Sequence, residues 1–238
     1  MEKIYTFHLM HLSASANVVL ASLGSVAIAF FVMFFLSRRI SLVPGRRQAL
    51  LEMIVDFTNK IVGSAMDEKL GLPYRFFTFV LFIYIAVNNI IGLSMIIVYK
   101  GFSFWGSPTA NAIVCLGLSA MVILLSHYKA VEKFGFRAYF KNTFLSPMPG
   151  MFPIKLIEEF TNTLTLGLRL YGNIYAGEIL LSLIAMFATS SGLTRGILAV
   201  PLAMIWMGFS TFIGFIQAFV FSTLSNVYIS HKLEVEDD

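Results

Sequence analysis

The chain has 238 residues, of which 58% are hydrophobic and only 13% are charged. Soluble domains are typically about 45–50% apolar and about 25% charged, so the composition excludes an ordinary soluble domain. One cysteine, Cys115, excludes a disulfide framework within the chain and a cysteine-rich metal site. The net charge of +4 comes from basic residues in loops, and no nucleotide-binding or zinc-protease motif is present. We therefore expect no nucleic-acid partner, no metal site and no cofactor.

Five stretches are long and apolar enough to cross a membrane. A spanning helix needs about 20 mostly apolar residues, because each residue advances about 1.5 Å through a hydrocarbon core about 30 Å thick. The last two stretches exceed this length, so we expect them to tilt or to extend beyond the bilayer. The predicted spans are residues 18–36, 76–99, 110–128, 153–188 and 197–229. No polar segment is long enough to fold separately, which predicts one all-α membrane domain over residues 1–238.

Residues 46–62 have the pattern of an amphipathic helix. Leu50, Ile54, Phe57 and Ile61 recur on one helical face, and the charged residues lie largely off it. This pattern predicts a helix that lies on the cytoplasmic membrane surface and serves as a positioning element, with a lipid-dependent or partner-dependent switch as the alternative.

Basic residues predict the orientation of the chain. Lys and Arg are concentrated between the first and second spans and between the third and fourth, whereas the other two connections offer only Lys100 and Arg195. Basic loops stay on the cytoplasmic side. The N-terminus is therefore expected outside, and the acidic C-terminus, residues 234–238, in the cytoplasm.

One arginine interrupts the apolar core of the fourth span. Placing Arg169 in mid-membrane costs at least about 2.5–3.5 kcal/mol. Glu178 cannot offset this cost, because nine residues at about 100° each place it on the opposite side of the helix, about 14 Å along the axis. Arg169 must therefore face water, another helix or a partner protein. A structural arginine, bonded to backbone carbonyls or to a carboxylate of a neighbouring helix, is the alternative.

Polar residues share the face of Arg169 at helical spacing. They are Thr165 and Asn173, four residues to either side, then Asn162 and Glu158. Glu158 and Glu159 lie towards the cytoplasmic end of the span and Glu178 towards the outer end. Ion transfer needs exchangeable groups on each side and a block between them, and a guanidinium suits the block because it stays protonated. The layout of acid, central arginine and acid therefore predicts ion transfer across the membrane.

The last span carries a pattern that suits close packing against another helix. Small residues recur every four positions, which permits close helix approach: Ser210, Gly214, Ala218 and Ser222. Gln217 lies nearly on the same face and can serve either as an interhelical contact or as a pathway residue.

Other polar residues in or near the spans are expected to be structural. Asn88 and Asn89 are predicted to bond between helices, Asn111 to start a helix, and His127 to lie at the interface.

Several of these segments resemble subunit a of bacterial F-type ATP synthases. Glu158-Glu159-Phe160, followed by residues 164–178 (LTLGLRLYGNIYAGE), resembles the signature of that family. Residues 216–221 (IQAFVF), with Val227-Tyr228, resemble its final helix, and residues 107–111 (SPTAN) the start of its third span. The match extends in order over nearly the whole chain.

The resemblance implies a stator subunit whose last two helices form a long, tilted hairpin against a rotating ring of c subunits. Arg169 matches the essential arginine that meets the ring carboxylates and separates two offset half-channels. Residues that the resemblance assigns to the outer route are Glu178, Asn173, Gln217 and Ser210. Those near the cytoplasmic route are Glu159, Glu158 and Asn162.

The resemblance also implies a setting. The expected partners are the c-subunit ring, the b-subunit peripheral stalk, the rest of the ATP synthase complex and the lipid bilayer of a bacterial plasma membrane. The transported ion is expected to be H⁺, with Na⁺ as the alternative. ATP would form in a separate soluble head, so the chain is expected to be no enzyme by itself. Two positions depart from the family: many members carry histidine where Ser210 stands and aspartate where Asn111 stands.

Two other functions compete with this interpretation. An ion-coupled secondary transporter component commonly shows internal repeats and broken helices, and the sequence has neither. A membrane scaffold would use the polar stripe only for packing, and it predicts that Arg169→Lys is tolerated.

Overall fold

A computed structural model describes residues 6–9, 12–38, 41, 45–94, 97–99, 102–105, 108–141, 143, 149–189 and 193–233. Five helical segments in this part are long and apolar enough to cross a membrane, which confirms the predicted all-α membrane fold. The helices are α1 (Ala16–Ser37), α2 (Arg46–Ala65), α3 (Glu68–Gly71), α4 (Arg75–Ser94), α5 (Ala112–Phe134), α6 (Phe136–Phe140), α7 (Phe152–Thr189) and α8 (Leu193–Leu233). Short 3-10 turns lie at Leu72–Tyr74, Pro108–Ala110 and Pro149–Met151.

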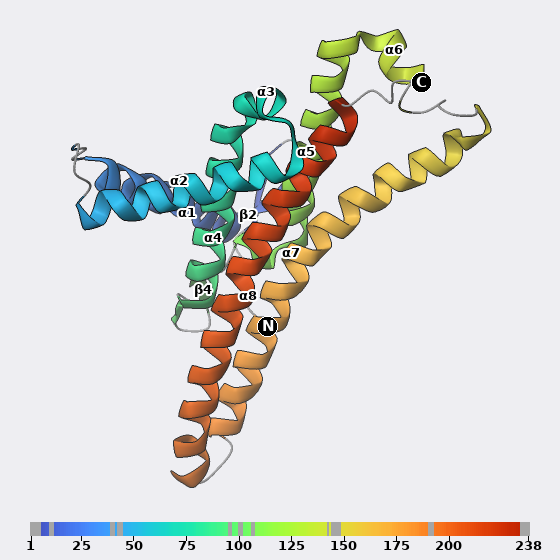
Figure 1. The fold of residues 1–238 in the computed structure, drawn as a ribbon. Helices are drawn as coiled ribbons and strands as arrows, with labels where there is room; N and C mark the ends of the chain where they lie inside the picture. The colour runs from blue at the N-terminus through green and yellow to red at the C-terminus, as the bar shows by residue number, and fades with distance from the viewer. Residues whose placement is uncertain are drawn as a thin grey trace.

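The two last helices dominate the shape. With 38 and 41 residues, α7 and α8 are about 57 and 62 Å long, well beyond a perpendicular span. Figure 1 shows them side by side as a hairpin at one end and diverging at the other. Both α4 and α5 pack against α8, and α5 also packs against α7. The predicted long hairpin is present.

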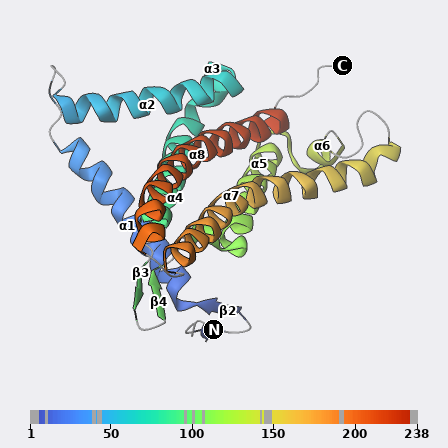
Figure 2. The same cartoon turned by 90° about the horizontal axis from the view of Figure 1, so that it is seen from below.

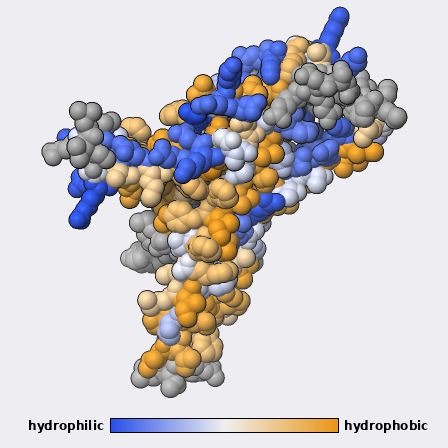
Figure 3. Space-filling model, in the orientation of Figure 1, coloured by the Kyte–Doolittle hydropathy of each residue, from blue (hydrophilic) through white to orange (hydrophobic). Residues whose placement is uncertain are grey.

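Polar residues gather at one end of the molecule. Figure 3 shows them over α2, α3 and the diverging ends of α7 and α8, whereas the narrow end of the hairpin is hydrophobic. The two ends of the α7–α8 hairpin thus differ in polarity, as expected for a protein whose charged loops lie on one side of a bilayer.

The second span ends earlier than predicted. Residues 76–99 were expected to be one helix, but α4 ends at Ser94, and β3 (Ile97–Tyr99) pairs with β4 (Phe102–Trp105) as an antiparallel hairpin. β-Branched and aromatic residues favour strands, and hydropathy alone does not register that preference. A second hairpin, β1 (Thr6–Leu9) with β2 (Leu12–Ser15), precedes α1. Both lie beside α1 in Figure 2, and neither was predicted.

The predicted amphipathic helix is present as α2. Figure 1 shows α2 lying across α4 and α8. The two halves of its apolar face differ in burial: Ile61 in the second half is buried, whereas Leu50 and Met53 in the first half are exposed. Phe57 packs on Phe82 of α4 and Phe219 of α8. The second half of α2 is therefore part of the protein core.

Small residues and amides join α4 to α8. The predicted small-residue strip of α8, Ser210, Gly214, Ala218 and Ser222, is buried. Asn89 donates through Nδ2 to the Gly214 carbonyl at 2.9 Å, as predicted, but Asn88 donates to Tyr84 within its own helix, so its interhelical prediction is wrong. Farther along, Thr78 Oγ1 donates to Asn226 Oδ1 at 3.0 Å.

The third span begins as predicted. Asn111 precedes α5, and its side-chain oxygen accepts from the Ile113 backbone N–H at 2.9 Å. This is the geometry of a helix N-cap.

Candidate ion-coupling site

Arg169 lies near the middle of α7, on the side that faces away from α5. Gly167 packs so closely on α5 that a Cβ atom there would lie 2.8 Å from Ser119 Oγ. Two residues at about 100° each turn Arg169 to the opposite side, where its side chain is exposed. Arg169 forms no hydrogen bond or ion pair with any residue that the structure describes. Within the described chain, the neighbouring carboxylate of the structural alternative is therefore absent.

The predicted polar stripe follows the open side of α7. Thr165 and Glu158 are exposed like Arg169, whereas Asn162 and Asn173 are partly buried. The buried residues of this helix, among them Leu166 and Leu170, lie at other positions of the helical repeat. The face that carries the arginine is therefore open to contact with lipid, water or another protein.

The residues assigned to the outer route lie along the hairpin of α7 and α8. Trp206 Nε1 of α8 donates to the Gly177 carbonyl of α7 at 3.3 Å, which aligns the two antiparallel helices. One turn further along α8 from this contact, Ser210 lies at about the level of Asn173. Glu178 is partly exposed beside the Gly177 contact, and Ser210 is buried.

By the same alignment, Gln217 lies slightly beyond the level of Arg169, near that of Leu166. It is seven residues beyond Ser210 on α8, a rise of about 10 Å, and its side chain is partly buried. The four outer residues are thus spread along the hairpin and do not form one compact cluster.

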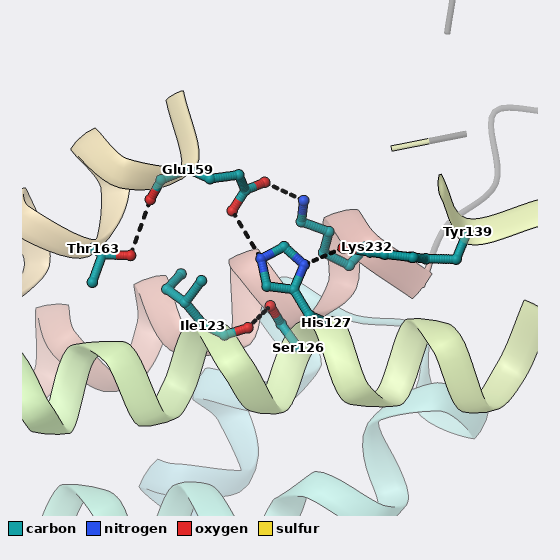
Figure 4. Close-up of polar contacts among 7 residues, drawn as sticks. All are labelled: Ile123, Ser126, His127, Tyr139, Glu159, Thr163 and Lys232. Carbon is teal, nitrogen blue, oxygen red and sulfur yellow. Dashed lines mark hydrogen bonds and ion pairs between the residues drawn. The ribbon is translucent and has the colours of Figure 1, made fainter. Parts of the chain in front are cut away.

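Glu158 and Glu159, near the other end of α7, differ in exposure and in their contacts. Glu158 is exposed and forms no ion pair with any described residue, whereas only 19% of the Glu159 side chain is exposed. One carboxylate oxygen of Glu159 accepts from Lys232 Nζ of α8, and the other lies 3.4 Å from His127 Nε2 of α5. Figure 4 shows both partners converging on the carboxylate.

Tyr139 of α6 completes this cluster. Its hydroxyl is hydrogen-bonded to His127 Nδ1, and the two rings meet edge to face with centroids 5.9 Å apart. Burial, and secondarily the Glu159 carboxylate, raise the pKa of Tyr139 to about 12, so its phenol stays protonated at neutral pH. Because a carboxylate only accepts, His127 must carry a proton on Nε2, and in the neutral ring Nδ1 then accepts from Tyr139. We call Glu159, Lys232, His127 and Tyr139 the Glu159 cluster.

Three members of this cluster have no functional signal in the sequence. The pattern of the third span predicts an interfacial position for His127, and it predicts no role for Lys232 or Tyr139. The Glu159–Lys232 pair spans 73 residues, and no local pattern joins residues so far apart. No group of three His, Cys, Asp or Glu side chains in the described residues could hold a metal ion.

Comparisons with known proteins identify the family. Residues 19–230 match the family model described as "ATP synthase A chain". "ATP synthase subunit a" of Pediococcus pentosaceus is 48% identical over 235 residues, 99% of both chains, and that of Enterococcus hirae is 46% identical over 237 residues, again 99% of both. "ATP synthase subunit a" of Listeria welshimeri is 41% identical over 235 residues, with the same coverage. The five apolar helices, the polar stripe on α7 and these full-length matches agree, and the chain belongs to the ATP synthase A chain family.

Proposed function

We propose that the chain, as the stator subunit a of a bacterial F-type ATP synthase, carries the route of the coupled ion past a ring of c subunits. The open face of α7 carries this proposal: Arg169 is exposed in mid-helix, and no described residue of its own chain pairs with it. An unpaired guanidinium in lipid is costly, so a carboxylate supplied by another polypeptide is its natural partner. Each ring subunit would present such a carboxylate in turn.

Two half-channels would reach this arginine from opposite sides. Glu178, Asn173, Ser210 and Gln217 would line the outer one, along the α7–α8 hairpin. Glu159, Glu158 and Asn162 would serve the cytoplasmic one, at the polar end of the molecule. The N-terminus would lie outside the plasma membrane, and the C-terminus, beyond the described residues, in the cytoplasm.

Arg169 would act as the block between the half-channels. A lysine can lose its proton in an apolar site, but arginine effectively cannot, so Arg169 remains a fixed positive charge. A ring carboxylate would pass it ionised and take up or release its proton on either side. One elementary charge that crosses 100 mV supplies about 2.3 kcal/mol, which would bias the direction of rotation.

The chain would perform no covalent chemistry. ATP would form in a soluble head, and the b-subunit peripheral stalk would hold this subunit and the head stationary relative to the ring. The ring carboxylate site would decide between H⁺ and Na⁺.

Replacing Arg169 tests the proposal. We expect Arg169→Ala and Arg169→Lys to abolish proton-driven ATP synthesis while the complex still assembles, since neither side chain can serve as a permanent guanidinium block. Synthesis is measured in energised membrane vesicles, and assembly by the amount of complex purified. Arg137→Ala, at an exposed arginine of α6, is the matched control and should behave as wild type. Normal synthesis by Arg169→Ala overturns the proposal, and normal synthesis by Arg169→Lys alone favours the scaffold alternative.

A further inference from the structure

Lys232 is a nearly buried cation at the end of the last helix. Only 9% of its side chain is exposed, and its Nζ donates to Glu159 Oε1. A buried charge is tolerated when it is paired, and removing one partner leaves the other uncompensated. The pair therefore fixes the last turn of α8 to the first half of α7.

His127 holds the same carboxylate from a different direction. It approaches Glu159 Oε2 from α5, and the Tyr139 hydroxyl contacts its far nitrogen from α6. Thr163 Oγ1 also donates to the Glu159 backbone carbonyl at 3.0 Å. Side chains of α5 and α8 thus contact the carboxylate directly and Tyr139 of α6 contacts it through His127, as Figure 4 shows. The adjacent Glu158 forms no ion pair with any described residue.

The Glu159 cluster lies between Arg169 and the beginning of α7 at Phe152. Glu159 is ten residues before Arg169, a rise of about 15 Å along the helix. The cluster is therefore placed where a route from the polar end of the molecule towards the arginine would begin.

We propose that Lys232 and His127 are positioning residues that hold the Glu159 carboxylate at the cytoplasmic mouth of the ion route, with Tyr139 orienting His127. The inference rests on the proposed function and assigns the mouth to Glu159 instead of Glu158. The chemistry involves no covalent bond of the protein: the hydrogen bonds and charges of Lys232 and His127 favour the ionised carboxylate, which accepts hydrogen bonds from water at the mouth while the proton passes along that water. A carboxylate fixed in place orients this water without first having to find its own orientation.

Variants at Lys232 test the inference in the whole ATP synthase complex. ATP-driven proton pumping is measured in inside-out membrane vesicles, together with the amount of assembled complex. We expect Lys232→Gln to lower pumping roughly tenfold, since a buried carboxylate loses its charged donor. Lys232→Arg keeps the charge and the donors and should restore pumping.

Lys133 provides the matched control. Its Nζ donates to the Leu233 carbonyl at 2.9 Å, so it ties α5 to the same turn of α8 without contacting Glu159. Lys133→Gln should therefore pump as wild type. Equal losses in Lys133→Gln and Lys232→Gln, or normal pumping by Lys232→Gln, overturn the inference.

A double variant separates positioning from stability. If Lys232→Gln alone assembles poorly, Lys232→Gln combined with Glu159→Gln removes both charges and should recover assembly, because no unpaired charge remains. We expect this double variant to assemble but to pump poorly, because it has no carboxylate at the mouth. Wild-type pumping by the double variant contradicts the inference.

The single variants distinguish a failure of this inference from a failure of the proposed function. If Arg169→Ala still synthesises ATP, the proposed function itself is refuted. If Arg169→Ala synthesises no ATP but Lys232→Gln pumps protons as wild type, only this inference is refuted.

Discussion

Glu178 is the residue on which proton transfer along the proposed outer route depends most in this chain, because no histidine stands at position 210. Ser210, which stands where many family members carry histidine, is buried, and a hydroxyl has no charged form at neutral pH. Asn173 and Gln217 also cannot ionise. Among the four outer residues, only Glu178 can take up and release a proton.

We therefore expect Glu178→Gln to reduce passive proton conduction to near the background of vesicles without the complex. Conduction is measured by the collapse of an imposed pH gradient after the soluble head has been stripped from the membranes. Glu132→Gln makes the same chemical change at an acid that pairs with Lys129 at the opposite end of the molecule, and it should conduct normally. Unchanged conduction in Glu178→Gln would show that the outer route does not use this acid.

At the scale of single residues, the sequence draws attention to side chains whose chemistry conflicts with their surroundings. Arg169 and Glu159 stand out in an apolar run because charge in lipid is costly. The partners of Glu159 were not predictable, since Lys232 and His127 reach its carboxylate only after three helices have packed. Asn88 was assigned the wrong contact for the same reason: adjacent amides on a helix point in different directions, and sequence does not say which one faces a neighbour.

At the level of helices, a close contact between α5 and α7 depends on a glycine. A Cβ on Gly167 would lie 2.9 Å from Leu116 Cδ2 and 3.0 Å from the Leu116 Cα, which is backbone and cannot turn away. An added methyl group must push the two helices apart.

Gly167→Ala should therefore destabilise the packing by about 1–3 kcal/mol, the typical cost of overfilling a tight contact. The measurement is the thermal inactivation temperature of the solubilised complex. Gly117→Ala, on the exposed side of α5 with nothing within 4 Å of the new Cβ, is the control and should leave the temperature unchanged. A similar temperature for both variants would mean that the helices separate freely at Gly167.

Helix positions were more predictable than helix ends. Hydropathy locates α7 and α8 well, because nothing but a helix satisfies the backbone across so long an apolar run. It fails at the end of α4, where Ile97, Val98 and Tyr99 are as apolar as the helix before them but prefer a strand. The alternating residues of β4 were the available signal.

For the whole molecule, the distribution of basic residues predicts which face is cytoplasmic. Lys60 is exposed on α2, at the polar end, and Thr189 is exposed at the last residue of α7, near the other end. Cys115 is the only cysteine in the sequence and is fully buried, so the wild-type chain gives no background with a thiol reagent.

A membrane-impermeant maleimide should then label Lys60→Cys only in inside-out vesicles and Thr189→Cys only in right-side-out vesicles. Labelling is followed by the mass of the purified chain, and the unsubstituted protein serves as the control in both preparations. The reverse pattern would invert the predicted topology.

The paired contacts between α4 and α8 have a mechanical consequence. The Asn89–Gly214 and Thr78–Asn226 hydrogen bonds attach α8 at points 12 residues apart, a separation of about 18 Å along its axis. A helix secured at one point can pivot, whereas a helix secured at two such points resists tilting under a sideways force. In the proposed motor, the torque of the ring against the exposed face of α7 and α8 would thus pass into α4, and the proposed ion route would keep its alignment during each step.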